Sequence, residues 1–257
     1  MKTRRAQRRV LGAAAALTIL GTLVVAGLAL AARREGEPFH WSGRMAAGSR
    51  LEIHGVNGAI EAAPATGSET VVDAEKSSRH TNPNRVHIEI EQTKGLTVIR
   101  AVYPHRWFTW GSDDVNVHFV VRVPAGVELR LMTVNGSVQA EGMENRVFAR
   151  TVNGGVHIDT GREAEARTVN GSITVRATPR SGDLHFRSVN GSVRLEIPAR
   201  ASVRLSAHTL NGSIVSDFPA GRMRSGFIGR SYEGTVGGGA AELEVTTING
   251  SIRVTRI

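Results

Sequence analysis

The chain has 257 residues, with 32 Lys and Arg, 23 Asp and Glu, and no cysteine. This length allows one or two domains with a sizeable core, and the lack of cysteine excludes a disulfide framework, a thiolate metal site and a cysteine nucleophile. Residues 1–34 carry seven of the basic residues and no acidic one, which leaves 25 basic and 23 acidic side chains in residues 35–257. The net charge of +9 therefore belongs mostly to the N-terminus and does not indicate nucleic-acid binding.

The N-terminus has the pattern of a membrane-targeting segment. Residues 1–9 form a basic tail, and residues 10–32 are an apolar run without a charged side chain. The run is long enough to cross a bilayer as a helix, and the basic tail predicts a cytoplasmic N-terminus with everything after the run exported. Because the run is longer than the apolar region of a usual signal peptide, we expect a signal-anchor helix; the alternative is a signal peptide cleaved near Ala-Leu-Ala at 29–31. The prediction is a single-pass membrane protein with its β domain in the periplasm or at the cell surface, or else a secreted domain.

After the apolar run we expect a linker over 33–47 and an exported β domain over 48–257. Alternating apolar and polar residues predict strands at 87–91, 96–101 and 115–123, the first two joined as a hairpin. No helical period over ten residues follows residue 32, so the exported part is predicted to be all-β.

From about residue 127 a six-residue motif recurs at intervals near 20 residues, beginning as Thr-Val-Asn-Gly-Ser-Val at 133–138. Asn-Gly is a strong turn signal because both residues tolerate positive φ. A fixed period near 20 is typical of stacked repeat units. A degenerate copy, with Glu in the place of Asn, is expected at 231–236. The predicted turn residues are Asn57, Asn135, Asn153, Asn170, Asn190, Asn211, Glu233 and Asn249.

Two all-β architectures fit this spacing. In an antiparallel hairpin meander, Asn-Gly is a two-residue loop, and Ser188 would pair with Val193 across it. In a β-solenoid, Asn-Gly is a corner, and each unit is a rung stacked about 4.8 Å from the next. Stacking also explains why a Thr before each Asn-Gly and a Val or Ile after it recur. We therefore expect a β-solenoid, a β-helix-like stack of short strands with Asn-Gly corners, together with one N-terminal transmembrane helix.

The T-V-N-G-S-[VI] ladder, behind an N-terminal membrane segment and without cysteines, resembles the bacterial putative-adhesin family of β-repeat proteins, a domain of unknown function. The resemblance covers residues 51–257, most strongly 127–257. The sequence departs from the pattern at Gly55, Gly154-Gly155 and Glu233. The resemblance implies a β-solenoid-like exported domain with a role in adhesion or the cell envelope, and it carries no catalytic residue to transfer.

One candidate ligand-binding group is the position three before each Asn, which would form a solvent-facing column in a stack. A column of cations suits an anionic glycan, a lipid or an acidic envelope protein. Its members are Arg150, Arg167, Arg187, His208 and Arg230, with His54 in the first unit. The alternative is a solvated face, neutralised by the acids six after each Asn. Those acids are Glu141, Asp159, Glu196 and Asp217, interrupted by Arg176.

A second candidate group is the aromatic segment 103–110, which contains Tyr103, Trp107, Phe108 and Trp110. Aromatic loop residues beside an arginine suit carbohydrate stacking, a protein partner or a membrane interface. The alternative is a hydrophobic lid over the open first rung of the stack.

These features predict a non-enzymatic, membrane-anchored module that binds or supports a component of the cell envelope, with no cofactor and no metal. One alternative is a polysaccharide-active enzyme, which would need two acids about 5–10 Å apart in a groove. Another is an envelope-stress or signalling accessory protein that assembles through a sheet edge after the last repeat. That edge would lie near Ile257, where Arg253 and Arg256 would discourage pairing.

Overall fold

The computed structural model describes residues 33–104, 114–178, 182–218, 221–226 and 229–257. Residues 33–257 form one unit, in which two eleven-stranded sheets face each other and one short 3-10 helix covers Pro83–Arg85. The predicted membrane segment 10–32 lies outside the described residues. Within the part of the chain that is described, no helix is long and apolar enough to cross a membrane.

The first sheet, sheet A, contains mainly the strands that follow each Asn-Gly pair. Its spatial order is β1 (Arg34–Glu35), β5 (Glu69–Ser78), β8 (Asn116–Val123), β4 (Ile60–Pro64), β10 (Val138–Met143), β12 (Val156–Thr160), β14 (Ile173–Ala177), β16 (Val193–Ile197), β22 (Ile252–Arg256) and β18 (Ile214–Ser216). The eleventh strand, β2 (Phe39–Arg44), pairs with β5.

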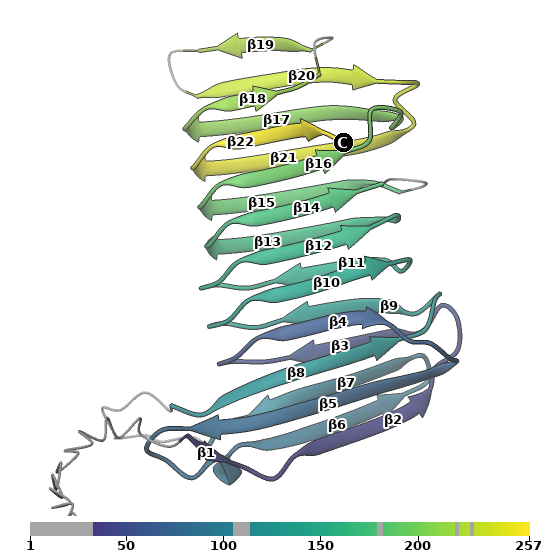
Figure 1. Cartoon of the computed structure of the whole chain (residues 1–257), viewed down its shortest axis with the longest axis vertical. Helices are drawn as coiled ribbons and strands as arrows, with labels where there is room; N and C mark the ends of the chain where they lie inside the picture. Colours follow the sequence, from purple (N-terminus) through teal and green to yellow (C-terminus); the bar gives the residue numbers. More distant parts are fainter. Residues whose placement is uncertain (1–32, 105–113, 179–181, 219–220, 227–228) are drawn as a thin grey trace, which may run out of the picture. The chain divides into compact units, whose positions relative to one another are not determined.

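The second sheet, sheet B, contains mainly the strands that precede each Asn-Gly pair. Its spatial order is β6 (His87–Thr93), β7 (Leu96–Val102), β3 (Arg50–His54), β9 (Glu128–Met132), β11 (Val147–Arg150), β13 (Ala164–Asn170), β15 (Leu184–Asn190), β21 (Ala241–Asn249), β17 (Val203–Asn211), β20 (Arg230–Val236) and β19 (Arg222–Ser225). Each repeat therefore contributes one strand to each sheet (Figure 1).

Equivalent residues of successive repeats lie side by side in parallel strands, as a solenoid requires. Ser188 pairs with Thr168 on one side and with Thr247 on the other, and not with Val193. The stacked arrangement is confirmed and the hairpin meander is wrong. The expected hairpin also forms, because β6 and β7 pair antiparallel.

The core lies between the two sheets and follows from the alternation in each strand. In β15 and β16, Leu184, Phe186, Leu195 and Ile197 are at most 2% exposed, while the residues between them face outward. One cluster of buried side chains continues from Leu51 to Val254. Residues 33–257 therefore carry their own hydrophobic core.

The order of rungs in space differs from their order in the sequence. The last repeat, β21 and β22, is inserted between the β15–β16 rung and the β17–β18 rung. The prediction of an open sheet edge near Ile257 is therefore wrong, since β22 has a partner on each side. The predicted corner at Glu233 is also wrong: this residue lies within β20, which runs antiparallel to β17 and forms no parallel rung.

The segment expected to be a linker, 33–47, is part of the fold. β1 and β2 both pair antiparallel with β5, and the half-buried rings of Phe39 and Trp41 pack against the core. The linker prediction failed because Gly36, Pro38 and Gly43 are typical of loops, although the six residues of β2 alternate between half-buried and exposed side chains.

Candidate functional site

The corners of the rungs are built by close backbone approach. A Cβ on Gly171 would lie 1.9 Å from the carbonyl oxygen of Gly154, and the corner glycines of the other repeats meet the same obstacle in the rung beside them. Gly58 alone among the corner glycines has a positive φ, of 124°. Glycine is required at the others by the backbone of the adjacent rung and not by the left-handed conformation that the sequence argument assumed.

In every repeat except the first, where Gly55 stands, the residue two before the Asn completes the corner with a buried hydroxyl. Thr168 Oγ1 donates to the carbonyl oxygen of Gly154 at 2.9 Å, and Ser188 Oγ donates to that of Gly171 at 3.0 Å. Both side chains are at most 3% exposed. The recurrence of Thr or Ser thus satisfies a backbone acceptor that would otherwise be buried without a partner.

All the predicted turn residues except Glu233 are asparagines. These asparagines lie at the corners, and their side-chain amides form a ladder. Starting from Asn135, the Nδ2 group of each donates to the Oδ1 atom of the asparagine before it in the stack at 2.8–2.9 Å. In spatial order the ladder is Asn57, Asn135, Asn153, Asn170, Asn190, Asn249 and Asn211. Because the amides use each other as partners, the ladder is an element of the stack rather than a ligand site.

The predicted arginine column lies on the outer face of sheet B. Arg150 is in register with Arg167, and Arg167 with Arg187. All three are exposed, and we call them the basic column. The inserted last repeat places Thr246 next in the column and separates it from His208.

Arg230 does not belong to the column. It lies opposite Thr209 in the antiparallel β17–β20 pair, and its Nη1 group donates to the carbonyl oxygen of Gly212. The prediction that Arg230 belongs to the column is wrong, because the motif at 231–236 does not fold as a parallel rung.

The acids six after each Asn do not neutralise the basic column. Glu141, Asp159 and Glu196 lie on strands of sheet A, and Asp217 directly follows its strand β18; the outer face of this sheet is on the opposite side of the core. Arg176 pairs with Glu196 at 3.0 Å and lies between it and Asp159. On sheet B, Glu165 pairs with Arg167, and among the described residues no ion pair involves Arg150 or Arg187.

A shallow hollow of about 310 Å³ opens beside the basic column. It is lined by Glu165, which pairs with Arg167, and by Arg167, His185, Phe186, Arg187, Glu244 and Thr246. The ring nitrogen Nδ1 of His185 lies 3.3 Å from a carboxylate oxygen of Glu244. The two guanidinium groups thus border a space open to a ligand.

An aliphatic column, which was not among the residues predicted from the sequence, runs beside the basic column, two residues further along each strand. Val169 is 38%, Ile248 40% and Leu210 47% exposed. The signal was present, since every Asn of the ladder follows an aliphatic residue. The column comprises Val56, Val134, Val152, Val169, Val189, Ile248 and Leu210.

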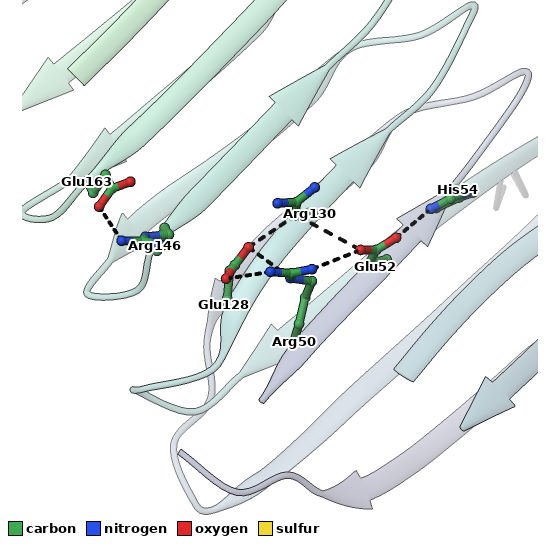
Figure 2. A network of polar contacts seen from close by, with 7 residues as sticks. All are labelled: Arg50, Glu52, His54, Glu128, Arg130, Arg146 and Glu163. Carbon is green, nitrogen blue, oxygen red and sulfur yellow. Dashed lines mark hydrogen bonds and ion pairs between the residues drawn. The ribbon is translucent and has the colours of Figure 1, made fainter. Parts of the chain in front are cut away.

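The same face is charge-balanced nearer β3. Arg50 Nε donates to Glu128 at 2.9 Å and Arg130 Nε donates to the same oxygen at 3.1 Å, while Glu52 approaches both arginines and His54 (Figure 2). Burial raises the pKa of Glu128, but the hydrogen bonds from the two arginines outweigh it and hold that pKa below its usual range. The guanidinium groups here are already engaged, unlike Arg150 and Arg187.

The predicted aromatic group is only partly described. Tyr103 is half-buried, and its hydroxyl donates to the carbonyl oxygen of Val115 at 3.1 Å, next to Asn57 at the end of the amide ladder. Trp107, Phe108 and Trp110 lie outside the described residues. Asp114, close by, accepts from the hydroxyls of Thr81 and Ser78 and from two backbone amides.

The model of the family described as Toastrack DUF4097 matches residues 50–255. The crystal structure of a putative cell adhesion protein from Clostridium sporogenes ATCC 15579 is similar in fold, with a TM-score of 0.51 at 10% identity, covering 86% of this chain and 100% of the other. A putative adhesin from Bacteroides fragilis NCTC 9343 gives a TM-score of 0.37 at 8% identity, covering 85% and 97%. No curated protein matches the chain. The family match covers most of the stacked rungs and confirms the resemblance drawn from the repeat: the chain belongs to the Toastrack DUF4097 family.

Proposed function

We propose that the domain is a non-enzymatic envelope module that binds phosphate or carboxylate groups along the outer face of sheet B. The observation that carries this proposal is the basic column of Arg150, Arg167 and Arg187, which stands on adjacent rungs beside the aliphatic column. The module would be exported and held at a membrane by residues 10–32, as the N-terminal sequence predicts.

The spacing of the column favours a ligand with repeated anionic groups. Rungs about 4.8 Å apart bring guanidinium groups close enough to repel by about 0.9 kcal/mol per adjacent pair in water. An anion placed between two guanidinium groups relieves this repulsion and accepts paired hydrogen bonds from each. The hollow between Arg167 and Arg187 offers such a place. The aliphatic column adds apolar contact on the same face, which suits a lipid headgroup region or the apolar face of a sugar.

The acids of sheet A do not support the enzyme alternative, which needs two acids that face each other across a groove. Asp159 and Glu196 stand on strands two rungs apart, but Arg176 lies between them and pairs with Glu196. The acids of this column do not line the hollow described above.

Binding of residues 33–257 to vesicles and to polysaccharides tests the proposal. We expect binding to anionic phospholipid vesicles or to an acidic polysaccharide, but not to their neutral counterparts; the two arms distinguish lipid from glycan. Arg167→Gln with Arg187→Gln should weaken that binding about tenfold or more, because charge-assisted hydrogen bonds are lost.

The matched control is Arg194→Gln with Arg253→Gln. This pair also removes two exposed arginines from adjacent rungs, but on the outer face of sheet A. Equal losses of binding in the two variants would show that net charge, and not the basic column, attracts the ligand, and would contradict the proposal.

A further inference from the structure

Among the described residues, the strand at each end of sheet B pairs on one side only. β6 is the last strand at one end and pairs with β7, whereas β19 is the last strand at the other end and pairs with β20 (Figure 1). An unpaired strand edge presents free N–H and C=O groups to another chain. The two edges are therefore the places where the sheet could continue into a second molecule.

The side chains of β6 alternate between acidic and apolar. Ile88 and Ile90 lie opposite the buried Ala101 and Ile99, so they point to the inner face, and Ile90 is nevertheless 38% exposed. The residues between and after them, Glu89 and Glu91, face outward.

The side chains of β19 alternate between basic and apolar. Met223 lies opposite the buried Tyr232, so it points to the inner face, and it is 47% exposed. Its neighbours Arg222 and Arg224 face outward. One end of the sheet thus presents a row of acid, apolar and acid, and the other end a row of base, apolar and base.

Strand direction makes the two edges compatible. β7 and β17 run the same way, because parallel pairs connect them through the sheet. β6 is antiparallel to β7, whereas β19 is antiparallel to β20 and β20 to β17, so β19 runs opposite to β6. If a second molecule is placed beyond β19 by translation along the stack, its β6 lies antiparallel to β19. Inner and outer faces remain aligned.

In this antiparallel pairing, one register places each of Arg222, Met223 and Arg224 opposite a side chain of β6 with complementary character. With Met223 opposite Ile90, Arg222 lies opposite Glu91 and Arg224 lies opposite Glu89. Cross-strand pairs of opposite charge and of apolar residues both stabilise a sheet. Two exposed apolar side chains, one from each end, would cover each other.

Charged edge strands usually discourage self-association, but here the two edges carry opposite charges and attract. Intramolecular contacts already use part of this charge: Arg100 pairs with Glu91 at 2.6 Å, and Glu233 lies opposite Arg222. Within the described ranges, neither Glu89 nor Arg224 takes part in an ion pair. The central attraction between copies is therefore the one between these two side chains.

We propose that copies of this domain associate head to tail, with β19 of one copy pairing antiparallel with β6 of the next. Such a contact joins two different surfaces and repeats without closing, which gives an open row. The contact is short, so its affinity in solution is weak, and attachment of copies to one membrane would raise their effective concentration. The proposal is independent of the basic column, since it uses none of its arginines and concerns the two end strands of sheet B.

Disulfide cross-linking tests the pairing directly, because the chain has no cysteine of its own. One sample of residues 33–257 carries Glu89→Cys and another carries Arg224→Cys. Under mild oxidation the mixture should give a cross-linked species containing one copy of each. No more cross-linking in the mixture than in the separate samples would overturn the proposal, as would a product that joins two Arg224→Cys copies, which indicates a two-fold contact.

Charge reversal tests the attraction. Sedimentation velocity should show self-association of residues 33–257 that increases with concentration. Glu89→Lys with Glu91→Lys makes both ends basic, and Arg222→Glu with Arg224→Glu makes both ends acidic, so each variant should be monomeric. An equimolar mixture of the two variants should associate again, which also shows that both are folded.

The control for charge reversal is Arg194→Glu with Arg253→Glu, far from both edges, which should associate like the unaltered domain. Two results would contradict the proposed head-to-tail association. One is an unaltered domain that stays monomeric up to its solubility limit; the other is a mixture of the two end variants that remains monomeric.

Discussion

Each corner glycine of the stack occupies a place where another rung's backbone leaves no room for a side chain. Gly171 and Gly154 illustrate this, since the carbonyl oxygen of one lies where a Cβ on the other would be. The buried hydroxyl of Thr168 then satisfies that same carbonyl oxygen. The repeated motif is therefore explained by contacts between rungs, residue by residue.

Gly171→Ala should destabilise the domain by about 1–3 kcal/mol or more, because the added methyl group forces two rungs apart. Urea unfolding of residues 33–257 would measure this. Gly67→Ala is the matched control, since a Cβ there meets nothing within 4 Å and the residue has no positive φ. Equal stabilities of the two variants would contradict the close-approach explanation.

Asp114 should make stability depend on pH. The hydroxyls of Thr81 and Ser78, followed by the amides of His80 and Arg79, hold the pKa of its carboxyl well below the usual range. A lowered folded-state pKa stabilises the fold above the ordinary aspartate pKa of about 3.9, and this contribution is lost as the pH falls through the folded-state value.

The comparison that isolates this carboxyl is Asp114→Asn. The variant should unfold more easily than the unaltered domain at neutral pH, and the difference in unfolding free energy should shrink as the pH falls below about 3.9. Denaturant unfolding over a series of pH values measures the difference. If the difference in unfolding free energy stayed constant into strong acid, the negative charge of the Asp114 carboxylate would not contribute to stability, which would contradict the prediction.

At the scale of elements, the last repeat is an internal rung although it ends the chain. β21 lies between β15 and β17, and β22 lies between β16 and β18. Among the described residues, the strands β17 to β20 therefore join the sheets of the earlier rungs only by pairing with β21 and β22, which come later in the sequence. The two sheets acquire their order only when the final 17 residues, 241–257, are in place.

Truncation after residue 238 should separate these elements. Without β21 and β22, the strands β17 to β20 lose their link to the β15–β16 rung and should lose protection from amide hydrogen exchange. The rungs from Asn57 to Asn190 should keep most of their protection, because their pairing does not involve the removed strands. Retained protection across β17 and β18 would show that this segment docks without the last repeat.

At the scale of the whole repeat domain, three surfaces have different chemistry. The outer face of sheet B carries the basic and aliphatic columns, and the outer face of sheet A carries the acids interrupted by Arg176. The two ends of sheet B carry opposite charges. A ligand on the face and a second copy at the end would not compete, so a row of copies would place the basic column of each on the same side. The proposed binding and the proposed assembly are thus geometrically compatible.

Much of the fold could be predicted from local sequence. The spacing of the Asn-Gly motif predicted parallel rungs, and alternation predicted the β6–β7 hairpin and a strand at 115–123, observed as Asn116–Val123, because each depends on contacts within a repeat or between identical positions. The exposed positions of Arg150, Arg167 and Arg187 followed from the same alternation.

Other features were decided by tertiary structure. The insertion of β21–β22 and the antiparallel course of β20 depend on which rung edge each segment meets, and a repeat motif is the same for every edge. The motif at 231–236 has the sequence pattern of a rung but pairs antiparallel with β17. Glu233 therefore forms no corner, and Arg230 does not belong to the basic column. The sequence by itself determined that rungs stack and which side chains face out. Only the tertiary structure decided the order of the rungs, and with it which arginines adjoin and which strands remain at the edges, because that order arises from backbone pairing between segments far apart in the chain.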